Sequence, residues 1–360
     1  MAKLDPLFRG LHQQGGSDLH LVSGQVPIMR IHGDLVRVKS EPLNDQTVRA
    51  LLREITPPVT WEMFEETGDV DFGYEVPGLA RFRANLFVQK SGAAGVFRLI
   101  PEEILTCEQL NLPPQVRNLA QLHKGLVLVT GPTGSGKSTT LAAIIDEANK
   151  TRNDHILTIE DPVEFVHKSR MSLVNHREVG NHTQSFAAAL RAALREDPDV
   201  ILVGEMRDLE TIRLAIEAAA TGHLVFGTLH TNNAAKTVDR IIEVFPADEQ
   251  EQIRSTLADS LKAVVAQTLF RTIDTPGRVA ALEIMICTPA IGNLIREGKT
   301  FQIPSLMQTG RAGGMQTLDH AILELLTANR IDPETAFERA INTELILPFL
   351  PAGHPAKQAT

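Results

Sequence analysis

The chain contains little cysteine, few aromatic residues and no long apolar run. Its 360 residues include two cysteines, Cys107 and Cys287, which lie far apart in the sequence. A disulfide framework and a four-cysteine zinc site are therefore excluded. No apolar run approaches the roughly 18 residues that a membrane-spanning helix needs. The first residues also lack the apolar segment of a signal peptide, so we expect a cytoplasmic protein.

An excess of positive charge is also missing, because the net charge is −9. A nucleic-acid motor usually carries a basic stripe, so we expect no nucleic-acid partner, although a local basic patch is compatible with an acidic average. Aromatic residues make up 4% of the chain, so its cores must consist mainly of Leu, Ile, Val and Ala. The 43% of hydrophobic and 22% of charged residues are typical of a globular protein, and the length is sufficient for two domains.

The first hundred residues predict a small α+β domain. Alternating apolar and polar residues predict strands at 17–22, 26–38, 69–74, 80–87 and 94–100. A short helix is expected over residues 4–14, and a second one begins at Asn44 or Asp45, either of which can cap it. Two consecutive prolines, Pro113 and Pro114, indicate a linker. We therefore assign residues 1–100 to the N-terminal domain and residues 101–114 to the linker.

Beyond the linker, the pattern changes to strands that alternate with helices. Nearly continuous apolar runs predict buried parallel strands at 126–130, 155–160, 200–203 and 224–228. Residues 185–195 predict a helix between two of them. This pattern is typical of a doubly wound α/β domain, which we place at residues 115–347. Its last third is expected to be mostly helical, with helices over 247–270 and 317–327. We expect the Pro- and Ala-rich tail, residues 348–360, to be disordered.

The most specific motif lies where the apolar run 126–130 ends in a glycine-rich turn and a helix-forming run begins. Gly131, Gly136, Lys137 and Ser138 match G-x-x-x-x-G-K-[ST] in the expected strand–loop–helix context. Backbone N–H groups of such a loop and the helix N-terminus attract phosphates. Lys137 can neutralise the β- and γ-phosphates, and the Ser138 hydroxyl can ligate Mg²⁺. We therefore predict that ATP and Mg²⁺ bind at Gly131, Pro132, Thr133, Gly134, Ser135, Gly136, Lys137, Ser138 and Thr139.

Hydrolysis also needs a group that orients the attacking water and a further metal ligand. Glu160 and Asp161 follow one buried strand, and Glu205 follows another. Ligands of doubly wound sheets bind at the carboxyl ends of the strands, where the phosphate loop also lies. Glu160 and Glu205 are thus candidate catalytic residues, whereas Asp208 is expected to cap a helix.

Two histidines flank the apolar run 224–228, and their spacing suits no zinc site. His230 follows the strand and is a candidate for hydrogen bonding to the γ-phosphate. The alternative for His230, and also for His223, is a buried histidine whose hydrogen bonds are satisfied within the protein.

The chain resembles the type IV pilus retraction ATPases of the secretion ATPase superfamily from about residue 4 to about residue 345. Four consecutive signatures carry the resemblance: the phosphate loop, an Asp box at 158–164, a Walker B stretch at 202–208 and a His box at 221–231. The resemblance implies a RecA-like P-loop ATPase domain behind a PAS-like N-terminal domain, assembled as a homohexamer with ATP at the domain junctions. It implies that Glu160 is the base, that Glu205 acts on Mg²⁺, and that His230 contacts the γ-phosphate.

The same resemblance gives Arg81 and Arg83 a catalytic role, because N-domain arginines of this family reach toward the phosphates of the nucleotide. On the sequence alone, the two arginines lie on one face of an alternating strand, which can also be a solvated face. The resemblance further implies an inner-membrane pilus platform protein as partner, an accessory retraction ATPase as a candidate partner, and a place at the cytoplasmic face of the inner membrane.

One departure from the family bears on the direction of the motor. Residues 290–297 resemble the A-I-R-N-L-I-R-E element of retraction ATPases, but Gly292 stands where the family has arginine. The expected function is an ATPase that powers pilus retraction and twitching motility. The alternatives are an accessory retraction ATPase, a RecA-like nucleic-acid translocase and a small-molecule kinase. Extension ATPases usually carry a four-cysteine zinc motif, which this chain lacks.

Overall fold

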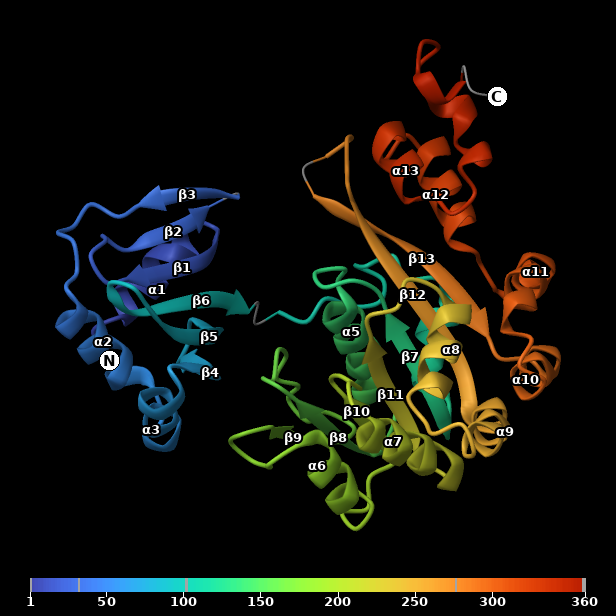
Figure 1. Cartoon of the computed structure of the whole chain (residues 1–360), viewed down its shortest axis with the longest axis horizontal. Helices are drawn as coiled ribbons and strands as arrows, with labels where there is room; N and C mark the ends of the chain where they lie inside the picture. The colour runs from blue at the N-terminus through green and yellow to red at the C-terminus, as the bar shows by residue number, and fades with distance from the viewer. Residues whose placement is uncertain (1, 32, 101–102, 276, 358–360) are drawn as a thin grey trace. The chain divides into compact units, whose positions relative to one another are not determined.

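The computed structural model describes residues 2–31, 33–100, 103–275 and 277–357 (Figure 1). The chain divides into two compact units. The first comprises Met1–Ile104 together with Asp161–Val166, and the second comprises Leu105–Glu160 together with His167–Thr360. Residues 101–102 of the predicted linker and 358–360 of the predicted tail lie outside the described residues.

Within the described residues, the first unit consists of an antiparallel sheet and three helices. The strand order is β3-β2-β1-β6-β5-β4. Its strands are β1 (Gly16–Val22), β2 (Ile28–Ile31), β3 (Asp34–Arg37), β4 (Asp69–Val76), β5 (Ala80–Gln89) and β6 (Gly92–Ile100). Its helices are α1 (Asp5–Gln13), α2 (Asp45–Ile55) and α3 (Pro58–Thr67). Asn44 caps α2 by accepting a hydrogen bond from the N–H of Thr47, as one of the two predicted caps.

The second unit contains a seven-stranded sheet of order β13-β12-β7-β11-β10-β8-β9. Its strands are β7 (Gly125–Thr130), β8 (His155–Glu160), β9 (Leu173–Glu178), β10 (Val200–Val203), β11 (Leu224–Leu229), β12 (Leu261–Arg271) and β13 (Arg278–Ile286). All neighbours from β12 to β9 are parallel, and β13 pairs antiparallel with β12. The predicted α/β class, preceded in the sequence by an α+β unit, is confirmed.

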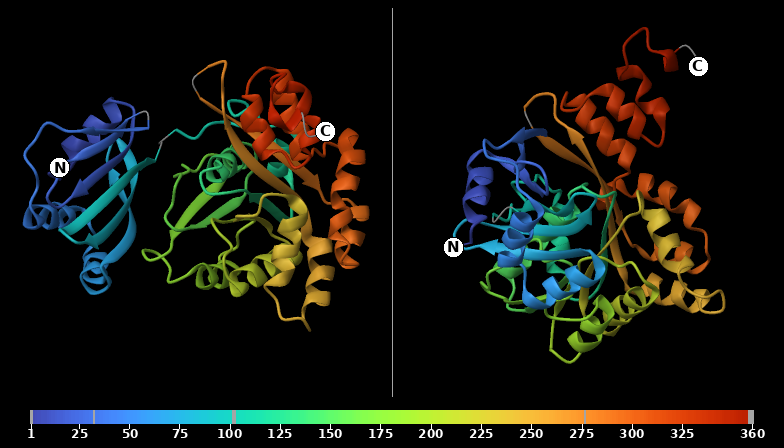
Figure 2. Two further views of the ribbon diagram at one scale, coloured as in Figure 1. Left: turned by 45° about the horizontal axis from the view of Figure 1, so that its top comes forward. Right: turned by 60° about the vertical axis from the view of Figure 1, so that its left-hand side comes forward.

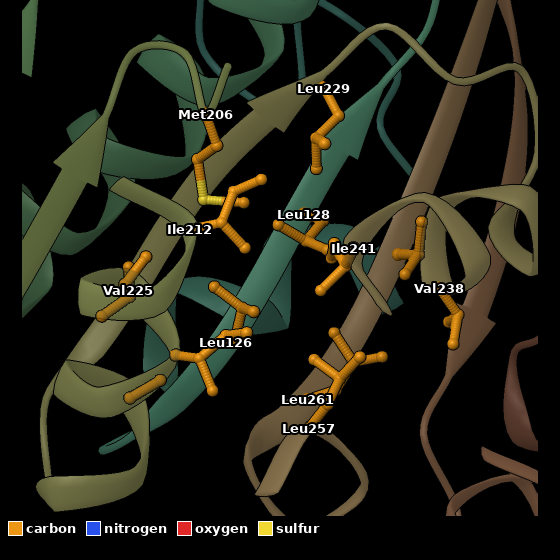
Figure 3. Packing of buried hydrophobic residues seen from close by; sticks show 14 of the residues in the cluster. Leu126, Leu128, Met206, Ile212, Val225, Leu229, Val238, Ile241, Leu257 and Leu261 are labelled. Atoms are coloured by element: carbon orange, nitrogen blue, oxygen red, sulfur yellow. The ribbon is translucent and has the colours of Figure 1, made fainter. Parts of the chain in front are cut away.

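Helices pack on both faces of this sheet, and further helices pack on those. The α-helices in the described part of the second unit are α4 (Pro114–Arg117), α5 (Lys137–Thr151), α6 (Phe186–Ala193), α7 (Leu209–Thr221), α8 (Ala234–Glu243), α9 (Gln250–Ser260), α10 (Pro289–Arg296), α11 (Ile303–Thr309), α12 (Leu318–Thr327) and α13 (Pro333–Arg339). Leu126 and Leu128 of β7 pack with Ile212 and Leu257 on one face (Figure 3). The alternate residues of β7 pack against α5 on the other face. Burial on both faces explains the continuous apolar runs of the parallel strands.

The predicted helix over residues 247–270 is wrong in its second half. Helix α9 ends at Ser260, and Leu261 begins strand β12, which lies between β7 and β13. Ile253, Leu257 and Leu261 keep a helical spacing of four residues across the end of α9. The apolar run that follows fits a buried helix as well as a buried strand. The β-branched pair Val264 and Val265 suits the strand. Strands β9 and β13 were also not among the predicted strands.

The β12–β13 hairpin contains the longest strands of this sheet, of 11 and 9 residues, and α12 packs against β13 (Figure 2). Short 3-10 helices follow α13, at Thr343–Leu345, Leu347–Phe349 and Pro355–Lys357. Within the predicted tail, the side chain of Leu350 is buried. No helix in the described ranges combines the length and the apolar character that crossing a membrane requires.

Candidate active site

The predicted site residues of the second unit follow four adjacent parallel strands at one edge of the sheet. Thr130 of β7 is in register with Leu229 of β11, and Val203 of β10 is in register with Ile159 of β8. The phosphate loop directly follows β7 and His230 directly follows β11. Glu205 comes two residues after the end of β10, and Glu160 is the last residue of β8. The carboxyl edge of a doubly wound sheet is the usual place for a ligand.

The phosphate loop has the backbone that its glycines allow. Gly131, Gly134 and Gly136 have φ angles of 141°, 77° and 87°, which side chains other than glycine rarely adopt. A Cβ atom at Gly131 would also lie closer than 3.0 Å to the main-chain oxygen of Gln267. Helix α5 begins at Lys137, directly after the left-handed Gly136, so its N-terminus adjoins the loop.

The tip of the phosphate loop is exposed to solvent, and its base is buried. Pro132, Thr133 and Gly134 are exposed, Gly131 and Ser135 are buried, and the residues from Gly136 to Thr139, with Ser138 among them, are half-buried. The Lys137 ammonium donates to the carbonyl oxygens of Gly131, at 2.9 Å, and of Pro132, at 3.1 Å. The lysine charge therefore lies on the loop that the sequence predicts to bind phosphates.

Gln267 of β12 contacts the buried base of the loop, and no sequence motif points to it. Its amide Nε2 donates to the carbonyl oxygen of Ser135 at 2.6 Å. Its Oε1 accepts a hydrogen bond from the hydroxyl of Thr140 at 2.8 Å. Residue 267 falls within the predicted helix over residues 247–270. A polar side chain within a buried apolar run is the signal that could have identified it.

Glu205 forms a charged cluster with two neighbours. His230 Nε2 lies 2.7 Å from Glu205 Oε1, and Arg207 Nε lies 2.6 Å from the same oxygen. Burial raises the pKa of Glu205, but the hydrogen bonds from Arg207 and His230 outweigh it, so the pKa lies below its ordinary value. The carboxylate is therefore ionised at neutral pH. A pocket of about 250 Å³ adjoins the cluster, lined by Glu205, Met206, Arg207, Ile212, Leu229, His230, Thr231 and Arg240.

Glu160 ends β8 and is 9% exposed. Gly204, the residue before Glu205, approaches it closely, since a Cβ atom at Gly204 would lie 3.2 Å from the Cα of Glu160. The N–H of Gly204 donates to the carbonyl oxygen of Ile159 at 2.8 Å. The structure thus brings the two predicted catalytic carboxylates to neighbouring strand ends.

Hydrogen bonds show the local roles of Asp208 and His223. Asp208 caps α7, as predicted, by accepting from the N–H of Thr211 at 2.8 Å. His223 Nδ1 lies 3.0 Å from the carbonyl oxygen of Ala218, which gives the imidazole a partner in the preceding helix. This contact supports the structural alternative for the half-buried His223.

Arg81 and Arg83 belong to the first unit. They lie on the same face of β5, between the buried Ala80, Phe82 and Ala84. Arg83 Nε is 3.6 Å from the carboxylate of Asp71 on β4, and its side chain is about half exposed. The predicted alternation of the strand is therefore confirmed, while the catalytic role of the two arginines stays a prediction.

This geometry defines a class: a P-loop ATPase on a parallel α/β sheet. Residues 80–330 match the family described as type II/IV secretion system protein. The chain is 56% identical over 328 residues to the type IV pilus retraction ATPase PilT of Pseudomonas aeruginosa, across 91% of this chain and 95% of that protein. It is 54% identical over 318 residues to a twitching motility protein of Neisseria gonorrhoeae, across 88% of this chain and 85% of that protein.

A solved structure of the pilus retraction motor PilT with bound ADP has a TM-score of 0.88 to this chain at 46% identity, covering 96% of this chain and 98% of that one. The chain therefore belongs to the type II/IV secretion system protein family, and within it the chain groups with the pilus retraction ATPases. The predicted resemblance, fold and enzyme class are confirmed.

Proposed function

We propose that this chain binds Mg-ATP at the carboxyl edge of its parallel sheet and uses the hydrolysis to retract type IV pili. The observation that carries the proposal is the convergence of the phosphate loop, Glu160, Glu205 and His230 on four adjacent strand ends. The high identity to a pilus retraction ATPase over nearly the whole of both chains supports the retraction part.

The residues present fit a Mg²⁺ ion that is held mainly by the nucleotide. Within the described ranges, no three His, Cys, Asp or Glu side chains gather into a metal cluster. Mg²⁺ at a phosphate site typically has one or two protein oxygens as ligands, and phosphate and water oxygens complete its shell. The Ser138 hydroxyl and the ionised Glu205 carboxylate are oxygen donors of this kind, so we assign them to the ion. The ion would neutralise charge on the β- and γ-phosphates.

In the proposed reaction, the loop N–H groups and Lys137 hold the β- and γ-phosphates. Glu160 orients a water molecule and accepts its proton. As the water oxygen bonds to the γ-phosphorus, the bond between that phosphorus and the bridging oxygen to the β-phosphate breaks, giving ADP and inorganic phosphate. The exposed His230, which pairs with Glu205 in this structure, would exchange that partner for the γ-phosphate.

We further propose a homohexamer in which Arg81 and Arg83 act as fingers that stabilise the charge of the transition state. The support is the family resemblance, together with the shared face of the two arginines on β5. Arginine suits this task because its planar guanidinium binds phosphate oxygens bidentately. The difference in affinity for ATP and ADP between closed and open subunits would supply the work.

The motor is proposed to act at the cytoplasmic face of the inner membrane on a pilus platform protein, with an accessory retraction ATPase as a second partner. The name of the Pseudomonas relative supports the pilus connection.

The first experiment separates binding from turnover. Glu160→Gln is expected to abolish ATP hydrolysis and to leave ATP binding intact, because the amide cannot accept the proton of water. The matched control is Glu210→Gln on the exposed start of α7, which should hydrolyse ATP at the wild-type rate. Wild-type turnover by Glu160→Gln would refute the assigned site.

The second experiment tests retraction. The wild-type chain and Gly292→Arg are each expressed in a host that lacks its retraction ATPase, and twitching motility is measured. We expect the wild-type chain to restore twitching. Restoration by Gly292→Arg alone, with equal ATP hydrolysis, would identify an ATPase uncoupled from retraction at α10. Failure of both variants would favour the accessory ATPase.

A further inference from the structure

Gln267 connects the phosphate loop to a strand that is remote in sequence. It lies on β12, where the adjacent Ala266 is in register with Thr130 at the end of β7. The side chain is 4% exposed. Both ends of its amide are used, one on Ser135 within the loop and one on Thr140 in the first turn of α5. Its main-chain oxygen also faces Gly131 at the start of the loop.

These contacts fix the direction of a peptide group in the loop. Ser135 directs its carbonyl oxygen at Gln267. Because a trans peptide is planar, the N–H of Gly136 points the opposite way, away from β12. A phosphate-binding loop depends on such N–H groups pointing into one concavity. Gln267 therefore holds one peptide of the loop in a fixed orientation without touching a ligand itself.

The chemistry of the position is specific for an amide. The carbonyl oxygen of Ser135 needs a donor, whereas the Thr140 hydroxyl donates and needs an acceptor. Glutamine supplies both groups from one side chain. Glutamate would turn an acceptor toward the Ser135 oxygen, and leucine would leave a buried acceptor unpaired, which is costly.

We infer that Gln267 is a positioning residue that holds the phosphate loop in its binding form before a nucleotide arrives. The inference rests on the proposed binding of nucleotide at this loop. If loss of Gln267 lets the loop occupy other conformations, the apparent affinity for nucleotide falls in proportion to the fraction of protein whose loop can still bind it. A residue that only stabilises the fold would lower the melting temperature and leave the affinity of the folded protein unchanged.

The test measures ADP binding to the full chain by calorimetry. Gln267→Leu is expected to weaken ADP binding by about tenfold or more, as for a loop competent about one tenth of the time. The matched control is Gln316→Leu, which removes another glutamine-to-backbone hydrogen bond, to Leu282 at 3.2 Å. This control should bind ADP as the wild type does. Equal affinity of folded Gln267→Leu and wild type would overturn the inference.

Two further variants complete the test. Thr140→Val removes the hydroxyl that holds the amide oxygen and should weaken ADP binding less than Gln267→Leu does. Since both variants break one network, the double variant should bind no more weakly than Gln267→Leu alone. If Gln267→Leu does not fold, Thr140→Val decides, and wild-type ADP affinity in that variant overturns the inference.

Lys137→Ala separates this inference from the proposed function. Loss of ADP binding in Lys137→Ala, with unchanged binding in Gln267→Leu, refutes the role of Gln267 alone. Wild-type ADP binding by Lys137→Ala would instead refute the assignment of the phosphate loop, and with it both proposals.

Discussion

Replacing Gly131 by alanine tests how tightly the phosphate loop is built against β12. The variant has two unfavourable terms in the folded state. The φ of 141° lies beyond the left-handed helical region, in a range that is essentially restricted to glycine, and it costs alanine about 1–3 kcal/mol. The new methyl group would also lie closer than 3.0 Å to the main-chain oxygen of Gln267, and such overpacking costs about 1–3 kcal/mol. The oxygen belongs to a strand paired on both sides, so it cannot easily move away.

Gly134→Ala is the matched control. Gly134 also has a positive φ, of 77°, but no atom lies within 4 Å of the position where its Cβ would be. The control therefore carries only a conformational cost, of roughly 1–2 kcal/mol for a left-handed residue. The overlap with β12 adds about 1–3 kcal/mol to the destabilisation of Gly131→Ala.

Scanning calorimetry of the nucleotide-free chain should show this difference. The melting temperature of Gly131→Ala should lie below that of Gly134→Ala by about 2–4 °C for each kcal/mol. The single tryptophan, Trp61, lies in the first unit, so its fluorescence assigns that unit's transition. Equal melting temperatures for the two variants would refute the close contact between Gly131 and β12.

Three further predictions follow from single contacts. The lowered pKa of Glu205 stabilises the fold above pH 4.5, and this stability is lost as the pH falls below that value. His230→Ala should raise the pKa of Glu205, so acid unfolding of this variant should begin at a higher pH than that of the wild type. Burial raises the pKa of Glu283, although two backbone N–H groups donate to its carboxylate. The resistance of the wild type to urea should therefore fall as the pH rises above 4.5, and that of Glu283→Gln should fall less over the same pH range. Gly292→Ala should raise the melting temperature, because alanine favours a helix by about 1 kcal/mol and the new Cβ, 3.3 Å from the Ala258 oxygen, needs only a small shift.

The parts of the site that the sequence predicted correctly are those encoded locally. The phosphate loop is a contiguous motif, and Glu160 and Glu205 lie at the ends of apolar runs whose short length favours a buried strand over a helix. Gln267 could not be found this way, because its partner Ser135 lies 132 residues earlier in the chain. To find Gln267 from the sequence, one would first have to know that β12 lies beside β7. The helical spacing of apolar residues across Ser260 concealed the start of β12.

A second remote contact links the His230 turn to the C-terminal helices. The buried carboxylate of Glu283 on β13 accepts from the N–H of Ala234, at 2.7 Å, and from the N–H of Leu318, at 3.4 Å. Ala234 begins α8, four residues after His230, and Leu318 begins α12. A buried acceptor that loses a donor is destabilised, so a displacement of this turn either takes Glu283 with it or breaks a buried hydrogen bond. If the proposed exchange of the partner of His230 displaces this turn, the hydrogen bonds of Glu283 would transmit that displacement to the start of α12.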